Sequence, residues 1–257
     1  MQARTKIAVV GATGRLGRHV VHVLNAAHDV VPISRSQGVD VFTGKGLAEA
    51  LSGVDTVIDV STFPTPDQDA ATEFFCTAAR NLHEIGERAG VKRMVEVSIV
   101  STDRYASGYS VAKAVHEKAM MAGQIPVQVL RATQFFEFVE QLLVWTRQDD
   151  VAYLPKMRFQ PVAARAVAMA LADVATRSAW TDSTGTGAPF PEVAGPRVEN
   201  LADLARQLAA HRGHPVRVEE LTDPADPDRV MEATGGLLPG PHATITGPTF
   251  TEWLEAS

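Results

Sequence analysis

The sequence offers little for disulfide or metal chemistry, because Cys76 is its single cysteine in 257 residues. One cysteine forms neither an internal disulfide nor a cysteine-based metal cluster, and it fits a reducing compartment. No apolar run approaches the roughly 20 residues that a membrane-spanning helix needs. The first six residues lead into a strand-like run and lack the apolar core of a secretory signal. These absences predict a soluble, cytoplasmic protein.

Basic residues are also in deficit, since 24 Lys and Arg stand against 30 Asp and Glu, a formal net charge of −6. An acidic balance argues against general binding to nucleic acid or to an anionic membrane surface. At about 150 residues per domain, the length predicts one large or two small domains with a sizeable core. We also expect the chain to be a monomer or a homodimer.

Strand and helix patterns alternate regularly through the first half of the chain. Helices with apolar residues at three- and four-residue spacing follow strands rich in Val and Ile, a pattern typical of a parallel sheet covered on both faces. Right-handed crossovers then predict a doubly wound α/β fold of the Rossmann type. The expected strands are Lys6–Val10, Val30–Ser34, Thr56–Val60, Arg93–Val100 and Val127–Arg131, with a short piece near Val39–Phe42; the expected helices run from the turn after Val10 to about Ala27 and over Leu47–Leu51, Gln68–Ala89 and Ser110–Met121.

The texture changes after about Asp149, where proline and glycine become frequent. Helices are expected there at Ala163–Ala175 and Leu201–His211, and an amphipathic turn at Phe250–Leu254. We therefore expect a Rossmann domain over residues 1–150. Residues 151–257 are expected to form a smaller α+β lobe that binds substrate and is interleaved with the first domain.

A glycine-rich segment, Gly11-Ala-Thr-Gly14-Arg-Leu-Gly17, follows the first strand and opens the first helix. Gly11 permits a tight turn, Gly14 lets the backbone approach a pyrophosphate, and Gly17 lets the helix pack on the strand. The helix N-terminus adds amide donors and a positive dipole end. An ordinary strand-to-helix turn is the alternative interpretation. The expected cofactor contacts in this loop are Gly11, Thr13, Gly14, Arg15, Leu16 and Gly17.

The end of the second strand indicates which dinucleotide binds. An NAD site usually carries Asp or Glu here for the ribose hydroxyls, whereas an NADP site carries a cation for the 2′-phosphate. The sequence reads Ser34-Arg35-Ser36, without a carboxylate, so Arg35 with the two serines favours NADP(H). Arg15 is a second candidate cation. A solvated arginine at a strand end is the alternative for Arg35.

The exit of the fourth expected strand, counting the short piece near Val39–Phe42, is Asp59-Val-Ser61-Thr62-Phe63, and it is expected at the carboxyl edge of the sheet, where ligands of open parallel sheets bind. Ser61 and Thr62 are therefore candidate cofactor contacts. Asp59 either lines the same path or is a buried strand carboxylate with local hydrogen bonds, and the sequence does not decide between these two interpretations.

Tyr109 and Lys113 lie four residues apart at the start of a predicted helix and so share one face. A nearby ammonium favours tyrosinate and lowers the pKa of the phenol from about 10. Tyr109 is then suited to exchange a proton with a carbonyl or alcohol oxygen, and Lys113 to bind the nicotinamide ribose. Ser98, at the end of the preceding strand, is the candidate that polarises the same oxygen, in competition with Ser101 and Thr102. The alternative is a helix-start aromatic and a solvated lysine.

The glycine spacing and the Tyr109-x-x-x-Lys113 pattern resemble short-chain dehydrogenases/reductases. Val97–Val100 and Val129–Phe135 are similar to the atypical, NmrA-like, NAD(P)H-binding branch of that superfamily. The resemblance implies an NADPH-dependent oxidoreductase that reduces a carbonyl, quinone or activated alkene of a small molecule. Because some NmrA-like proteins bind the dinucleotide without turning it over, a non-catalytic NADP(H) redox sensor is the alternative function.

An aromatic segment follows the last strand of the first half, and it is interpreted either as a roof over the substrate or as ordinary core. The candidate substrate pocket is Phe63, Gln134, Phe135 and Phe136. No metal site is expected, because the histidine pairs His19 and His22, and His211 and His214, lack a third ligand in register.

Overall fold

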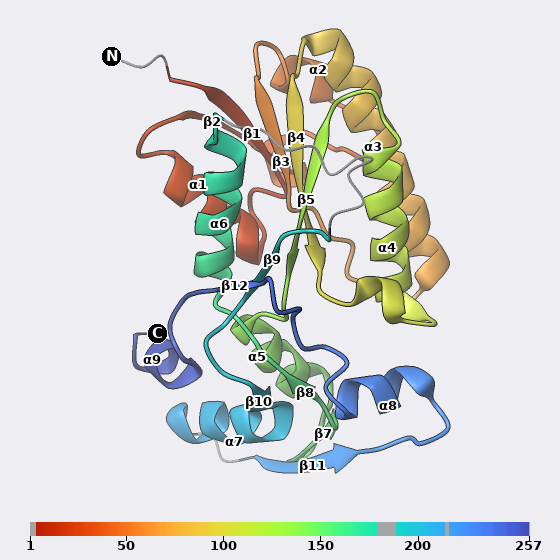
Figure 1. Cartoon of the computed structure of the whole chain (residues 1–257), viewed down its shortest axis with the longest axis vertical. Helices are drawn as coiled ribbons and strands as arrows, with labels where there is room; N and C mark the ends of the chain where they lie inside the picture. Colours follow the sequence, from red (N-terminus) through yellow and green to blue (C-terminus); the bar gives the residue numbers. More distant parts are fainter. Residues whose placement is uncertain (1–3, 179–188, 214–215, 257) are drawn as a thin grey trace. The chain divides into compact units, whose positions relative to one another are not determined.

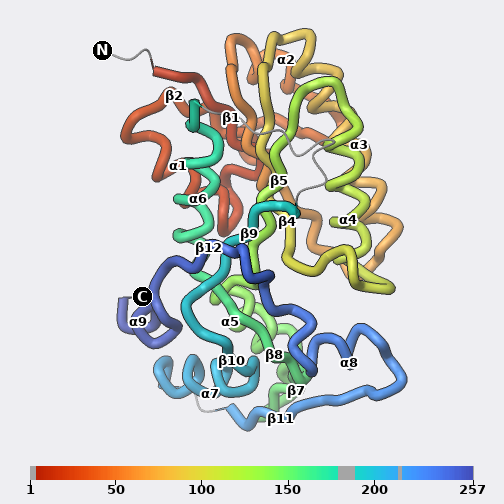
Figure 2. Tube along the Cα trace, in the orientation of Figure 1, coloured from red at the N-terminus to blue at the C-terminus, as the bar shows by residue number. Residues whose placement is uncertain are grey.

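The computed structural model describes residues 4–178, 189–213 and 216–256, and it contains two compact units built from several segments each (Figures 1 and 2). The first unit comprises Met1–Ser98, Ser107–Arg131 and Val167–Pro191. The second comprises Ile99–Ala106, Ala132–Ala166 and Glu192–Ser257. The expected assignment of cofactor binding to residues 1–150 and substrate binding to residues 151–257 stays a prediction. His214 lies outside the described residues.

The first unit carries five strands of a parallel sheet in the order β5-β4-β3-β1-β2. Strand β1 pairs in parallel with both β2 and β3, and β3 pairs in parallel with β4. The doubly wound α/β fold expected from the sequence is therefore confirmed. The strands are β1 (Lys6–Val10), β2 (Asp29–Ile33), β3 (Thr56–Asp59), β4 (Arg93–Ile99) and β5 (Val127–Ala132); the helices are α1 (Arg15–Leu24), α2 (Leu47–Ala50), α3 (Gln68–Ala89), α4 (Gly108–Met121) and, for most of its length, α6 (Ala164–Thr176).

Helices cover both faces of this sheet, as its apolar strands require. Figure 1 shows α3 and α4 on one face and α1 and α6 on the other. Arg93, at the start of β4, donates hydrogen bonds to the carbonyl oxygens of Ala175 (2.9 Å) and Arg177 (3.0 Å) at the end of α6. A cation at a helix C-terminus satisfies carbonyls that have no intrahelical partner. The helix expected at Ala163–Ala175 thus exists, but most of it belongs to the first unit rather than to a C-terminal lobe.

The longest helix, α3, has the bounds that the sequence predicts. Its N-cap Asp67 accepts hydrogen bonds from the amides of Asp69 and Ala70, and Gly90 ends it in the left-handed conformation with φ +83°. A carboxylate N-cap and a C-terminal glycine are standard boundary residues. Its start and end are therefore set by local chemistry as well as by packing.

The piece expected near Val39–Phe42 is not a strand. The Val39 amide donates to the carbonyl of Ser34 (3.1 Å), and the Phe42 amide donates to Asp40 Oδ1 (2.9 Å). Asn81 of α3 donates to the carbonyls of Val41 and Phe42, each at 2.8 Å. Side chains thus take up backbone groups that a sheet neighbour would otherwise bond, and the chain passes from β2 through α2 to β3.

Among its described residues, the second unit contains short strands and four further helices, of which the sequence predicted those at Leu201–His211 and Phe250–Leu254 but not the other two. Its β7 lies between β6 and β11, antiparallel to β6 and parallel to β11. Within this unit the ring of Phe136 packs against Phe250 and Trp253, with centroids 5.2 Å and 5.5 Å away. The strands are β6 (Arg147–Gln148), β7 (Val151–Pro155), β8 (Arg158–Phe159), β9 (Glu192–Ala194), β10 (Glu199–Asn200), β11 (Arg217–Leu221) and β12 (Thr244–Ile245); the helices are α5 (Phe136–Trp145), α7 (Leu201–His211), α8 (Pro227–Ala233) and α9 (Phe250–Glu255).

The described helices include none that combines the length and the hydropathy needed to cross a membrane.

Candidate functional site

The glycine loop packs against its surroundings so closely that side chains are excluded. Gly11 adopts φ +78°, and a Cβ placed on it would lie 2.8 Å from the carbonyl oxygen of Val60. A Cβ on Gly17 would overlap the carbonyl oxygen of Gly11 and lie 2.8 Å from Ala12 Cα. The N-cap of α1 is Gly14, which has no side chain to satisfy the first-turn amides. The loop therefore presents backbone donors at a helix N-terminus, as a phosphate site requires.

The loop lies where the sheet order reverses. After β1 the chain goes to β2 on one side and then to β3 on the other, so the carboxyl ends of β1 and β3 are adjacent. The Val60 amide donates to the carbonyl of Val10 (3.0 Å), and the Gly11 amide donates to Ile33 at the end of β2 (2.9 Å). In open α/β sheets, ligands bind at this switch point.

The exit of β2 carries the predicted phosphate-binding residues. Arg35 is exposed and opens a short 3-10 helix, Arg35–Gln37. The hydroxyls of Ser34 and Ser36 lie 3.0 Å apart. Arg15, in the first turn of α1, is also exposed. The residues present fit a phosphorylated dinucleotide: a cradle that a Cβ would fill, uncapped amides, and cations where an NAD site carries a carboxylate.

The exit of β3 supplies two further predicted contacts. Asp59 is buried (1% exposed) and accepts a hydrogen bond from the Ser61 amide at 2.8 Å, so the structure agrees with the interpretation of Asp59 as a buried strand carboxylate. The Ser61 hydroxyl is buried and has no hydrogen-bond partner among the described residues. Thr62 is exposed, and its hydroxyl lies 2.8 Å from the hydroxyl of Tyr109.

Lys113 is buried in a cluster of charges rather than solvated. Its ammonium lies 2.9 Å from Glu96 Oε1, 3.0 Å from the carbonyl oxygen of Val97 and 2.8 Å from His116 Nδ1. His116 Nε2 in turn lies 3.4 Å from Asp59 Oδ2. We call Asp59, Glu96, Lys113 and His116 the charge quartet. It joins the ends of β3 and β4 to one face of α4.

The quartet combines two acids with two bases in a dry interior. Burial is the largest single effect on both carboxyls and opposes their ionisation, but His116, Lys113 and, for Asp59, the Ser61 amide together outweigh it, so the pKa values of Asp59 and Glu96 lie below their usual range. Burial is also the largest single effect on the bases and opposes their charge, but Glu96 leads the groups, Asp59 among them, that together outweigh it, and the pKa values of Lys113 and His116 lie above their usual range. These directions favour a cluster of two anions and two cations, because an unpaired buried charge is costly.

Tyr109 and the two bases of the quartet, Lys113 and His116, pack around one buried ring, that of Phe75 in α3. His116 stacks on this ring with centroids 4.6 Å apart, Lys113 Nζ lies 4.9 Å from its centroid, and Tyr109 meets it edge-on at 5.7 Å. The amide of Gly108, the residue before Tyr109, donates to Gln68 Oε1 at the start of α3 (2.8 Å). Tyr109 and Lys113 are thus both packed against the Phe75 ring of α3.

Ser98 lies on β4 in the same unit, with 3% exposure and no hydrogen-bond partner for its hydroxyl among the described residues. Its competitors differ in setting. Ser101 adopts the left-handed φ of 64°, which is uncommon for a residue with a Cβ. Thr102 is fully buried. Both belong to the second unit, whereas Ser98 belongs to the first.

The predicted pocket residues fall in different environments. Phe63 stacks on Phe74 with centroids 5.1 Å apart in the first unit. In the second unit, Phe136 is 1% exposed and packs as core, and the Gln134 Oε1 atom is buried without a hydrogen-bond partner among the described residues. Phe135 is half-buried at the N-cap of α5.

Sequence reasoning missed Glu96 and His116. Two signals were present: Glu96 is a carboxylate inside an apolar strand, and His116 follows Tyr109 and Lys113 at the next turn of one helical face. Neither signal identifies the partner, because a buried carboxylate pairs with whichever base the fold brings to it.

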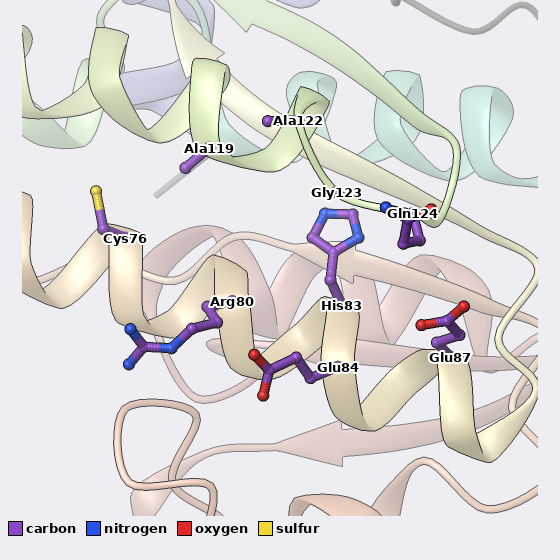
Figure 3. Close-up of a pocket in the computed structure, with 9 residues that line it drawn as sticks. All are labelled: Cys76, Arg80, His83, Glu84, Glu87, Ala119, Ala122, Gly123 and Gln124. Carbon is purple, nitrogen blue, oxygen red and sulfur yellow. The ribbon is translucent and has the colours of Figure 1, made fainter.

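A separate hollow of about 260 Å³ lies between α3 and the end of α4 (Figure 3). His83 points toward Gly123 there, and its Nε2 lies 2.8 Å from the carbonyl oxygen of Met120. None of the predicted site residues lines this hollow. The described part of the chain also holds no group of three or more His, Cys, Asp or Glu side chains placed to bind a metal ion.

The fold is of the doubly wound Rossmann type, and the residues at its switch point fit a phosphorylated dinucleotide. No family model matches the chain. It is 31% identical over 126 residues to L-arabinose 1-dehydrogenase (NAD(P)(+)) from Haloferax volcanii, covering 46% of this chain and 48% of that protein. It is 30% identical over 115 residues to the photosystem II assembly factor Ycf39 of Synechocystis, covering 39% of this chain and 35% of the other. The matches thus span less than half of either relative.

Solved structures match over nearly the whole chain. The NADPH complex of the Escherichia coli quinone oxidoreductase QOR2 aligns with a TM-score of 0.71 and 20% identity, over 97% of this chain and 99% of the other. A short-chain dehydrogenase/reductase superfamily protein from Agrobacterium tumefaciens, with bound NAD, aligns with a TM-score of 0.65 and 17% identity, over 98% and 95%. The chain has the fold of this superfamily, so the resemblance stated from the sequence is confirmed in the fold.

Replacing Gly17 with Ala tests the close packing of the loop. The added Cβ overlaps backbone atoms that cannot rotate away, so we expect a loss of about 1–3 kcal/mol in unfolding free energy. Gly86→Ala, inside α3, is the matched control, because its Cβ meets the side-chain end of Ile125 at 3.1 Å. We expect this control to be neutral or stabilising by up to about 1 kcal/mol. Urea unfolding measures both, and equal values for the two variants would contradict the packing argument.

Replacing Lys113 with Met tests the quartet. The carboxylates of Asp59 and Glu96 would then face one base, and removing one member of a buried ion pair typically costs about 3–5 kcal/mol. Lys118→Met, on the exposed side of the same helix, should change stability by less than about 0.5 kcal/mol. Urea unfolding at pH 7 compares them. A loss in Lys113→Met no greater than that in the control would show that the quartet does not contribute to stability.

Proposed function

We propose that the chain is an NADP(H)-dependent oxidoreductase of the short-chain dehydrogenase/reductase type. The observation that carries the proposal is the glycine cradle at the switch point of the sheet, beside a β2 exit, Ser34–Ser36, that has the cation Arg35 and no carboxylate. When bound, NADPH supplies the hydride for reducing a carbonyl, a quinone or an activated alkene. The names of an arabinose dehydrogenase and a quinone oxidoreductase among the similar proteins support this reaction type.

The residues that hold the dinucleotide come from three strand exits in the first unit. The amides of Thr13, Arg15, Leu16 and Gly17 at the start of α1 bind the pyrophosphate. Arg35 binds the 2′-phosphate with its planar guanidinium, supported by the hydroxyls of Ser34 and Ser36, and Arg15 adds positive charge. The unpartnered hydroxyl of Ser61 and the exposed Thr62 extend the site along the exit of β3.

Tyr109 carries the proton in this proposal. Its hydroxyl, held at 2.8 Å by Thr62, donates a proton to the substrate oxygen. The Ser98 hydroxyl, which lacks a partner among the described residues, donates a hydrogen bond to the same oxygen. Lys113 stabilises the negative charge left on Tyr109.

Arg35→Ala tests the choice of cofactor. Losing a charge-assisted contact to the 2′-phosphate is worth about 1.5–3 kcal/mol, so NADPH affinity should fall about tenfold to a hundredfold. NADH affinity should change little, and the preference for NADPH should largely disappear. Fluorescence titration measures both ligands, with Arg88→Ala at the exposed end of α3 as the control. Equal wild-type affinities for NADPH and NADH would reject the role of Arg35.

Tyr109→Phe tests the chemistry. Because the variant removes only the donor oxygen, NADPH binding should persist while turnover falls about a hundredfold or more. NADPH oxidation is followed by absorbance over a panel of quinones, aldoses, other carbonyls and activated alkenes. Tyr153→Phe, on β7, should retain wild-type turnover. Unchanged turnover in Tyr109→Phe would reject Tyr109 as the proton donor.

One observation favours a second function, that of a non-catalytic NADP(H) sensor. The Lys113 ammonium lies within 3.0 Å of three groups of the protein, which are Glu96, the Val97 carbonyl and His116, so the lysine is engaged by the protein itself. A sensor would bind NADPH tightly and oxidise it with no member of the panel. Turnover of any panel substrate with retained NADPH preference decides for the enzyme.

A further inference from the structure

The residues Asp59 and His116 link the two groups to which the proposed function assigns the proton chemistry. On α4, Tyr109, Lys113 and His116 occupy one face at successive turns. His116 Nδ1 lies 2.8 Å from Lys113 Nζ, and His116 Nε2 lies 3.4 Å from Asp59 Oδ2. His116 therefore connects the side chains on this face of α4 to Asp59 on β3.

Asp59 also holds the turn after β3, in which Thr62 contacts Tyr109. Its other oxygen, Oδ1, accepts the hydrogen bond of the Ser61 amide at 2.8 Å. The next residue, Thr62, places its hydroxyl 2.8 Å from that of Tyr109. The contacts thus close into a ring that runs from Tyr109 through Thr62 to Asp59, His116 and Lys113, and back along α4.

His116 Nδ1 can form either of two hydrogen bonds, and each excludes the other. It lies 2.8 Å from Lys113 Nζ and also 2.8 Å from Glu96 Oε1. A neutral ring nitrogen accepts a hydrogen from the ammonium, whereas a protonated one must donate to the carboxylate. Two of the three ammonium hydrogens are held by Glu96 and the Val97 carbonyl in either case. The proton on Nδ1 therefore decides whether the third hydrogen of Lys113 is bound by His116.

The charge state of His116 depends on the groups that face it from the elements packed against it. Asp59 faces it from β3, Glu96 from β4 and Lys113 from its own helix, while α3 presents the uncharged ring of Phe75. Two carboxylates against one ammonium leave a negative charge that the imidazolium neutralises. Burial and the Lys113 ammonium lower the pKa of His116, but Glu96 and Asp59 together raise it by more, so protonation persists above the ordinary value of 6.5.

We propose that Asp59 and His116 are positioning residues that act through Lys113 and Thr62, and that the proton on His116 Nδ1 releases one hydrogen of Lys113 for the bound dinucleotide. This inference rests on the proposed function. With His116 protonated, Lys113 has a hydrogen for a ribose hydroxyl of the dinucleotide. With His116 neutral and its remaining hydrogen on Nε2, which faces Asp59, the third hydrogen of Lys113 is taken up by Nδ1, and the dinucleotide loses a charge-assisted bond.

The test is NADPH affinity, measured by fluorescence from pH 5.5 to 10, together with NMR titration of ring-labelled histidine. Wild-type affinity should fall about tenfold as pH rises through the His116 midpoint, because one charge-assisted hydrogen bond is lost. The affinity midpoint should coincide with the NMR midpoint of His116. His116→Asn, which cannot titrate, should remove this step, whereas His22→Asn at an exposed position should keep it. Each variant titrates against the same ligand, so the ionisation of the 2′-phosphate cancels.

Asp59→Asn is the second variant, and it retains His116. Removing a facing carboxylate lowers the pKa of His116, so both midpoints should move to lower pH together. A His116 resonance that titrates without any change in NADPH affinity would overturn the inference and leave the proposed function standing. So would a His116 that does not titrate while affinity still falls. If the wild type binds NADPH at no pH, the proposed function itself fails. Should neither variant fold, the coincidence of the two wild-type midpoints decides.

Discussion

The ammonium of Lys113 is the constraint around which the first unit is arranged. A buried cation survives only where carboxylates meet it at short range, so α4 is held in register with β4 by Glu96 and, through His116, with β3 by Asp59. The Phe75 ring of α3 lies against both bases and against Tyr109. Two helices and two strands are thus joined by electrostatics as well as by apolar packing. This explains why charged residues occupy positions in strands and helix faces that would otherwise be filled by Val or Leu.

The same sheet edge carries a second constraint of a different kind. At the carboxyl ends of β1 and β3 the backbone of the glycine loop is in contact with neighbouring backbone, and no side chain fits between them. Asp59 is the last residue of β3 and also a member of the quartet, so it connects the quartet to the sheet edge that carries the loop. In the proposed function, this arrangement separates binding from chemistry: backbone amides and arginines would hold the phosphates, whereas side chains positioned by the quartet would contact the reacting oxygen. The two sets of residues are rigid for different physical reasons.

The parts of this structure that the sequence predicted are those with local signals. The bounds of α3 follow from the Asp67 cap, the apolar period and Gly90. The location of the candidate phosphate loop follows from the glycine spacing directly after a strand. What escaped prediction depends on distant partners. Val39–Phe42 looks like a strand, yet Asn81 donates to the carbonyls of Val41 and Phe42. His116 shares a helical face with Lys113, yet the two carboxylates that face it come from β3 and β4, which the sequence alone does not place beside it. Strands as short as β6 and β12, two residues each, carry no period to detect.

The chain passes from one unit to the other after Ser98, Ala106, Arg131, Ala166 and Pro191, so neither unit is a continuous stretch of sequence. The first unit is therefore incomplete until synthesis has passed residue 191, because most of α6 and the segment up to Pro191 belong to it, and the second still needs the segment from Glu192 onward. A chain cut at residue 150 lacks the helix whose last turn Arg93 holds, and it exposes the sheet face that this helix covers. Because the two units are interleaved along the chain, the stability of each depends on the folding of the other. A proteolytic nick or an insertion near a crossing would disturb both, and gene fusion or permutation would be tolerated only away from these five positions.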